Sequence, residues 1–212
     1  MNYAQLSTLI QDYCESTEQS FVANIPTFVQ LAEERIYNSV QIPAIRKNVT
    51  GTMTQNFQYF QLPSDWLSTF SLAVIDPTTG EYEYLLNKDV NFIRASYPPP
   101  NSTGKPKYYA IWNNVSMILG PTPDVNYTAE LHYYYYPTSI VSSSTSWLGD
   151  NFETVLLYGS LREAYTYLKG EGDMMQNYEA KYQEALGQLK RLGDGLDRQD
   201  AYRSGQVRIP VT

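Results

Sequence analysis

The spacing of apolar residues changes twice along the 212-residue chain, and this change constrains the fold more than any other feature. Near both ends, apolar side chains recur every three or four positions, which is the period of an amphipathic helix. Between residues 46 and 148 they alternate with polar residues or form short runs bounded by turn residues, which is typical of strands. We therefore expect an α+β protein in which helices from both ends form one helical bundle around an inserted antiparallel β-rich segment.

Two helices are expected within residues 1–45. The first presents one apolar face, made of Leu6, Ile10, Tyr13 and Cys14. The second is expected to open at Pro26, which the first turn of a helix tolerates, after a cap at Asn24. Pro43 marks the end of this region, because proline cannot continue a helix.

The middle segment, residues 46–148, is expected to form short strands with one brief helix. The strands are expected at 49–54, 57–62, 72–75, 81–85, 108–112, 116–119 and 127–136. The third and fourth of these are separated by a five-residue loop containing Gly80, which indicates a hairpin. Asn87 is expected to cap a helix that runs to Ser96. Such a series of short strands favours a small antiparallel sandwich or barrel.

Helical spacing returns after residue 149. Two helices, 150–169 and 173–193, are expected to form a helical hairpin, with Asp150 or Asn151 capping the first and Asp173 the second. Gly193 is the expected C-cap. Residues 194–212 have charges and glycines but little apolar periodicity, so we expect an extended tail. The expected organisation is a bundle of 1–45 and 149–193, a β-rich insertion of 46–148, and a tail of 194–212.

Catalytic chemistry has few candidate groups in this chain. There is one histidine, His132, on an expected strand, with no acid or nucleophile pattern beside it, and one cysteine, Cys14, on an expected apolar helix face. A zinc site built from histidine and cysteine needs more ligands than these two residues supply. Glycine-rich phosphate-binding loops are absent from the sequence. We expect no enzyme activity and no cofactor or metal.

The charge and the hydrophobic pattern exclude further classes of function. The formal net charge is −7 and the sequence contains no cluster of Lys and Arg, so specific nucleic-acid binding is not expected. No apolar run reaches the ~20 residues of a membrane-spanning helix. The first residues lack the pattern of a secretory signal, so we expect the protein to be made and folded in a cytoplasm.

Tyrosine is unusually abundant, with twenty residues in the chain. Tyrosine combines a large apolar face with a polar tip and therefore suits contact surfaces that are only partly dry. The same residues could instead fill the faces of a β-rich domain, and the composition leaves both interpretations open.

Two segments carry a resemblance to a known family. The first comprises Phe28–Tyr37 and the turn Leu62-Pro63-Ser64-Asp65-Trp66 that ends a β-segment; the second comprises Tyr158–Tyr165 and Tyr178–Leu186, followed by a charged tail. Together they resemble the head-to-tail adaptors (connector or tail tubular protein A-like proteins) of tailed bacteriophages.

The resemblance implies a structural virion protein that forms a ring, a dodecamer in this family, between the portal protein and the tail nozzle protein and extends the DNA conduit. We expect the tail to dock on the portal through Arg198, Tyr202, Arg203 and Arg208. Alternatives are another tail or head-completion protein, such as a nozzle or fibre-attachment protein. A carbohydrate-binding module using Trp66, Trp112 and Trp147 is a further alternative.

Overall fold

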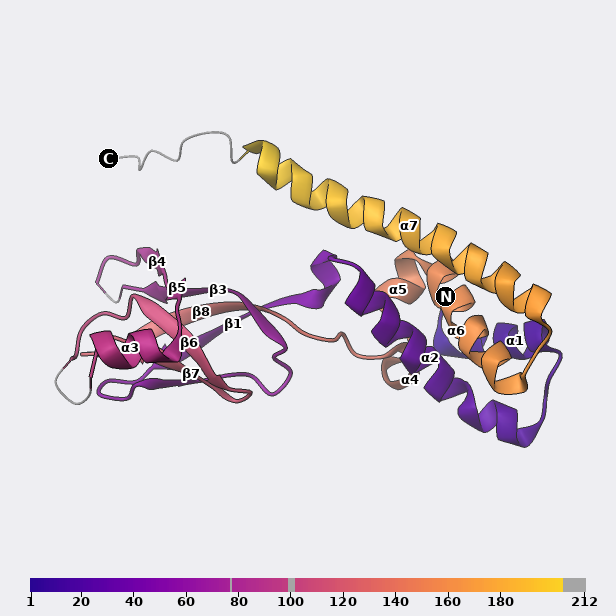
Figure 1. Cartoon of the computed structure of the whole chain (residues 1–212), viewed down its shortest axis with the longest axis horizontal. Coiled ribbons are helices and arrows are strands. Elements are labelled where there is room, and N and C mark those ends of the chain that lie inside the picture. Colours follow the sequence, from indigo (N-terminus) through magenta and orange to yellow (C-terminus); the bar gives the residue numbers. More distant parts are fainter. Residues whose placement is uncertain (77, 99–101, 204–212) are drawn as a thin grey trace. The chain divides into compact units, whose positions relative to one another are not determined.

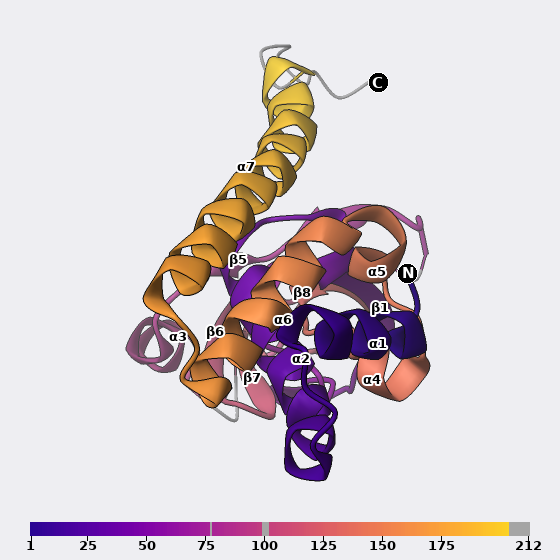
Figure 2. The same ribbon diagram turned by 90° about the vertical axis from the view of Figure 1, so that its right-hand side faces the viewer.

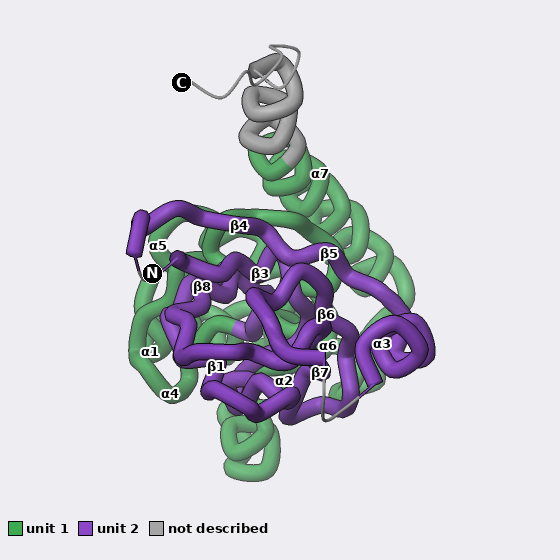
Figure 3. The backbone as a smooth tube through the Cα atoms, turned by 90° about the vertical axis from the view of Figure 1, so that its left-hand side faces the viewer, with its two compact units in different colours: residues 1–45, 137–212 green, residues 46–136 purple. Residues whose placement is uncertain are grey.

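The chain divides into two compact units, as Figures 1 and 3 show. The computed structural model describes the backbone of residues 1–76, 78–98 and 102–203 and the side chains of these residues up to Gly193. The helical unit comprises Met1–Ile45 and Pro137–Thr212, and the β-unit comprises Arg46–Tyr136. The α+β class predicted from the sequence is confirmed.

The helical unit is built around one central helix. Its elements are α1 Tyr3–Cys14, α2 Gln19–Ser39, a 3₁₀ turn Pro43–Ile45, α4 Ile140–Ser143, α5 Trp147–Asn151, α6 Glu153–Leu168 and α7 Gly172–Arg203. Helix α6 packs against α1, α2, α5 and α7 and lies among them in Figure 2. Leu6 and Ile10 of α1, and Leu161 of α6, are completely buried. The helical periodicity at the two ends of the chain therefore describes faces that pack within one unit.

Several helix boundaries differ from the prediction. Helix α7 begins at Gly172, so Asp173 lies inside it and is not its cap. Helix α2 begins at Gln19, so Pro26 lies inside it. Proline removes one helical hydrogen bond, but Ile25 before it and Val29 after it are both fully buried and hold the helix in place. The cap expected at Asp150 or Asn151 is also wrong, because a separate short helix, capped by the Ser146 side chain, precedes α6.

Another difference concerns the end of α7, which continues to Arg203. The predicted C-cap at Gly193 is therefore wrong. A Cβ atom placed on Gly193 would lie 2.4 Å from the backbone oxygen of Gln41. Glycine is needed here because two backbones approach closely, and its role is packing within a helix and not helix termination. Residues 204–212 of the predicted tail lie outside the described residues.

The β-unit contains two four-stranded sheets. Their strands are β1 Arg46–Met53, β2 Tyr59–Gln61, β3 Ser68–Ile75, β4 Tyr82–Tyr84, β5 Leu86–Asn87, β6 Tyr108–Asn113, β7 Ser116–Gly120 and β8 Tyr127–Tyr134. Sheet A has the order β1-β8-β3-β4 and is antiparallel throughout. Sheet B has the order β2-β7-β6-β5, with β5 parallel to β6. The predicted hairpin is confirmed as β3–β4, in which Ile75 is opposite Tyr82.

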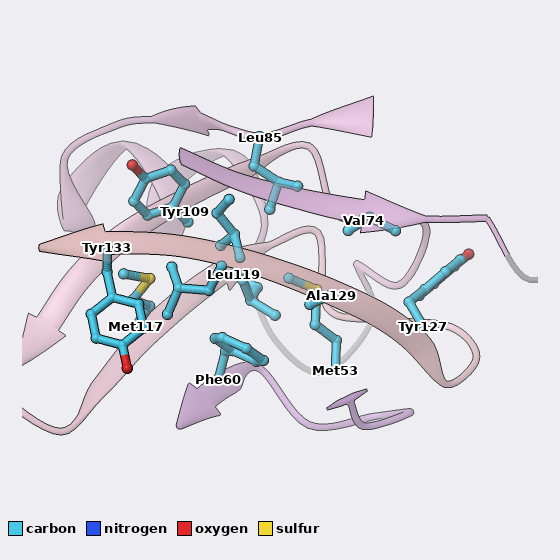
Figure 4. Packing of buried hydrophobic residues seen from close by; sticks show 12 residues of the cluster. Met53, Phe60, Val74, Leu85, Tyr109, Met117, Leu119, Tyr127, Ala129 and Tyr133 are labelled. Atoms are coloured by element: carbon cyan, nitrogen blue, oxygen red, sulfur yellow. The ribbon is translucent and has the colours of Figure 1, made fainter. Parts of the chain in front are cut away.

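The core of the β-unit consists of side chains from both sheets (Figure 4). Alternate residues of β8 point into it, so Leu131 and Tyr133 are buried whereas His132 and Tyr134 are on the other face. Helix α3, Val90–Ser96, packs on the outer face of sheet B through Ile93. Its cap is Asp89 rather than the predicted Asn87, because the Asp89 side chain accepts the N–H of Asn91.

Candidate interaction surfaces

The turn Leu62–Trp66, between β2 and β3, has a structural role. Asp65 pairs with Lys47 of β1 at 2.7 Å and accepts a hydrogen bond from the hydroxyl of Tyr133 at 2.8 Å. The lysine and this hydroxyl hold the pKa of Asp65 below its ordinary value. The neighbouring Trp66 donates its indole N–H to Thr69 and packs against the core of the β-unit. These contacts fix the turn against β1 and β8.

His132 has an acidic neighbour that the sequence prediction missed. Its Nε2 atom lies 2.9 Å from Glu130 and 2.7 Å from the side-chain amide of Asn48. The hydrogen bond with His132 lowers the pKa of Glu130. The strand period explains this contact, because residues two apart on β8 share one face. The Tyr82 hydroxyl, 3.4 Å from Glu130, extends the polar row across the outer face of sheet A.

Cys14 lies at the end of α1, where burial raises the pKa of its thiol to about 11. A thiol with this pKa is almost entirely protonated near neutral pH and is therefore a poor nucleophile and metal ligand. Within the described residues, no group of three or more His, Cys, Asp and Glu side chains could hold a metal ion.

Aromatic side chains gather on the outer face of sheet A. The sheet A cluster comprises Arg46, Phe70 and Tyr134. The guanidinium of Arg46 lies 4.8 Å from the ring centroid of Phe70 and 5.7 Å from that of Tyr134. The two rings meet edge to face at 6.0 Å. Phe70 is 53% exposed, and it occupies an irregularity of β3 between Thr69 and Ser71 that turns it outward.

A second aromatic cluster lies on the outer side of sheet B. The sheet B cluster comprises Phe57, Tyr59, Trp112 and Arg94. Tyr59 contacts Phe57 at 5.9 Å and Trp112 at 5.8 Å between ring centroids. The Arg94 guanidinium, from α3, lies 4.5 Å from the Trp112 ring centroid. Phe57 and Trp112 are both more than two-fifths exposed. Cation–π and edge contacts thus preorganise two amphipathic surfaces on opposite faces of one sandwich.

The sequence model of the SU10 adaptor protein family matches residues 1–210. The chain belongs to the SU10 adaptor protein family. This is a family of phage head-to-tail adaptors, so the resemblance noted in the sequence is confirmed and the chain is a structural phage component. A comparison with curated proteins gives no match.

An adaptor functions through contact surfaces, and the two aromatic clusters are candidates for such surfaces. Sequence reasoning anticipated tyrosine-rich contacts but did not identify Phe57, Phe70, Arg46 or Arg94. The aromatic content was the available signal. It could not show which rings face outward, because that depends on the irregularity in β3 and on the position of α3.

The three tryptophans of the sugar-binding alternative lie in different packing environments. Trp66 packs against the core of the β-unit, and the guanidinium of Arg94 lies over the ring of Trp112. Trp147 belongs to the helical unit, where it stacks on Phe152. Each therefore has a packing partner in this adaptor family member.

Most of the residues predicted to dock on the portal belong to α7. Arg198, Tyr202 and Arg203 lie within the last turns of α7, and Arg208 lies outside the described residues. Among the described residues, no helix is long and apolar enough to cross a membrane.

Proposed function

We propose that this adaptor forms a ring, a dodecamer, between the portal protein and the tail nozzle protein and extends the DNA conduit within the virion. The observation that supports it best is the pair of aromatic clusters on opposite faces of the β-unit. A ring closes through heterologous contacts, in which one surface of a protomer meets a different surface of the next. Two unlike surfaces that face opposite directions meet this requirement.

The composition of the clusters suits such contacts. Aromatic residues and arginine are enriched in protein interfaces, where they supply most of the binding free energy. The Arg46 and Arg94 guanidinium groups are already held over aromatic rings. Little side-chain freedom is therefore left to lose when a neighbour binds.

The charge of the chain is compatible with a conduit. With a formal net charge of −7, the protein has no general attraction for the phosphate backbone. A wall that does not bind DNA allows the genome to move past it. We propose assembly in the host cytoplasm, before the virion is released.

Docking on the portal is assigned to the residues after Gly193. The buried side chains Tyr182 and Leu189 of α7 come before this point. The segment with Arg198, Tyr202, Arg203 and Arg208 can therefore engage another protein without loss of these core contacts. Arginine and tyrosine are suited to this because they make polar and stacking contacts together.

Native mass spectrometry tests the ring directly, with the full chain measured alone and after addition of the portal protein from the same phage. We expect a closed oligomer, either alone or on the portal. A chain that remains monomeric in both samples would favour a different tail role, such as a nozzle or fibre-attachment protein.

The portal contact is tested by deleting residues 195–212. We expect loss of portal binding, while far-UV circular dichroism falls only by the contribution of the deleted helical residues 195–203 and the remaining chain still unfolds cooperatively. A triple variant, Arg198→Gln with Arg203→Gln and Arg208→Gln, should also weaken binding. The matched control is Lys190→Gln with Arg191→Gln, which removes exposed charge from the packed part of α7. Equal binding by the triple variant and the control would refute the assignment.

A further inference from the structure

Strand β1 is the only long strand at a sheet edge in the described β-unit. The four edge strands are β1, β4, β2 and β5, and their lengths are eight, three, three and two residues. Strand β1 pairs with β8 in a continuous register from Arg46 to Met53, without a bulge. Short edges and bulges normally protect a sheet from pairing with another chain. β1 has neither protection, which indicates an edge that pairs with another strand.

The register shows which backbone groups of β1 face outward. The carbonyl of Tyr134 accepts the N–H of Leu67, so Tyr134 bonds toward β3 and not toward its partner Arg46. Bonding direction alternates along antiparallel strands. The N–H and C=O groups of Asn48, Thr50 and Thr52 therefore point away from β8, along the free edge.

A groove of about 280 Å³ follows this edge. It lies between β1 and β2, the edge strands of the two sheets, and its lining includes Val49, Phe60, Leu62 and Leu131. A Cβ atom on Gly51 would lie 3.2 Å from the Phe60 ring, so the glycine lets this ring reach the edge of β1. Both components of a strand-addition site are present, a row of backbone donors and acceptors and an apolar channel beside it.

The chain itself contains a segment with the matching pattern. Residues 206–211 read Gln-Val-Arg-Ile-Pro-Val, in which Val207, Ile209 and Val211 alternate with polar residues and proline. As a strand, this segment would present its three aliphatic side chains on one face. It follows α7, and six residues are enough to span Asn48, Thr50 and Thr52 of β1.

We propose that residues 206–211 of a second copy of this chain add to β1 as a parallel strand, with Val207, Ile209 and Val211 in the groove. This inference rests on the proposed ring and identifies one of its contacts between copies. The proline sets the direction. In parallel pairing, the backbone groups that bond to Asn48, Thr50 and Thr52 belong to the residues whose side chains enter the groove. Pro210 is not one of these residues, so its nitrogen faces away from β1 and needs no hydrogen. In antiparallel pairing Pro210 would have to donate, and it has no N–H.

The pairing leaves the polar face of the segment free. Arg208 would lie opposite Thr50 on the outer face of sheet A, away from the groove. One tail can therefore join two copies through its aliphatic face while Arg208 remains available to the portal.

Cross-linking of the full chain tests the contact without portal protein. In a Cys14→Ser background, Thr50→Cys is combined with Arg208→Cys, and a short bismaleimide is added to concentrated protein. We expect covalent dimers and larger species on denaturing gels. The matched control is Tyr84→Cys with Arg208→Cys, which places the cysteine on β4, the opposite edge of the same sheet, and should give only monomer.

Several outcomes would overturn the proposal: no cross-link at Thr50, equal yield at Tyr84, or a link within a single chain. Adding Ile209→Asp to the Thr50 pair should lower the yield about tenfold, because a carboxylate would be buried in an apolar groove. An unchanged yield with Ile209→Asp would also refute it. If the ring forms on the portal but no cross-link appears, the strand addition fails and the proposed function stands.

Discussion

Of the sixteen large hydrophobic side chains exposed among the described residues, twelve belong to the β-unit and four to the helical unit. The helical unit buries its apolar faces against α6, the helix that contacts α1, α2 and α7. The β-unit has a core between its sheets but also displays aromatic side chains on both outer faces. The difference indicates that the helical unit is a closely packed scaffold and that the β-unit carries the contact surfaces.

The close packing of the scaffold is visible at its glycines. A Cβ atom on Gly159 of α6 would lie 3.3 Å from both Ala32 of α2 and Tyr182 of α7. On the outer sheet faces of the β-unit, by contrast, side chains such as Phe70 project into solvent. Substitutions should therefore alter folding in the helical unit and assembly in the β-unit.

The largest effect on stability is expected from Leu161→Ala in α6. Leu161 is completely buried, and its truncation leaves a cavity among the helices that costs about 3 kcal/mol of unfolding free energy. Denaturation monitored by far-UV circular dichroism measures this loss. Leu192→Ala, at an exposed position of α7, should change the unfolding free energy by less than about 0.5 kcal/mol. Similar losses for both variants would contradict the close packing around α6.

Two glycines of α7 should respond in opposite directions. Gly193→Ala would place a methyl group against the backbone of Gln41 and should destabilise the protein by about 2 kcal/mol. Nothing lies within 4 Å of a Cβ on Gly187, so Gly187→Ala should stabilise it by about 0.8 kcal/mol through helix propensity. Thermal unfolding of the two variants measures the signs, and the same sign for both would show that Gly193 is not a contact point.

Glu33 connects α2 to the chain that returns from the β-unit. Its buried carboxylate accepts the N–H of Ile140 at 3.0 Å. Glu33→Ala would leave that donor without its partner and should cost about 1.5 kcal/mol. Glu33→Gln keeps an acceptor and should cost less. Urea denaturation at neutral pH compares the two variants, and equal losses would argue against a role for this hydrogen bond.

The pH dependence provides a second readout for Glu33. Burial raises the pKa of its carboxyl, more than the hydrogen bonds from Ile140 and Ser139 lower it. The folded state therefore holds this proton more tightly than the unfolded state, so the contribution of Glu33 to stability is largest at low pH. It falls as the pH rises from the ordinary glutamate pKa through the raised value. Glu33→Gln should remove this part of the pH profile, and an unchanged profile would assign the titration to another group.

The smallest stability effects are expected at the aromatic clusters. Phe70→Ser and Phe57→Ser should each change the unfolding free energy by less than about 1 kcal/mol, because both side chains are about half exposed. They should nevertheless weaken self-association in native mass spectrometry. Leu31→Ser, at a similarly exposed position of α2, is the matched control and should leave self-association unchanged. Equal effects at all three positions would remove the distinction between scaffold and contact unit.

The sequence by itself determined the α+β class, the β3–β4 hairpin and the family. Periodicity is a local property, so buried faces such as Leu6 and Ile10 could be read directly. The family motif could be read for the same reason, although its role, the pairing of Asp65 with Lys47 and Tyr133, could not.

Only the tertiary structure decided which exceptions to the local rules are tolerated. Pro26 lies inside α2 because buried side chains on both sides outweigh one lost hydrogen bond, and Gly193 continues α7 because a distant backbone segment lies against it. The clusters around Phe70 and Trp112 depend likewise on a strand irregularity and on the placement of α3. These features are set by contacts between residues far apart in the chain, and the energy of such contacts is not contained in any local stretch of sequence.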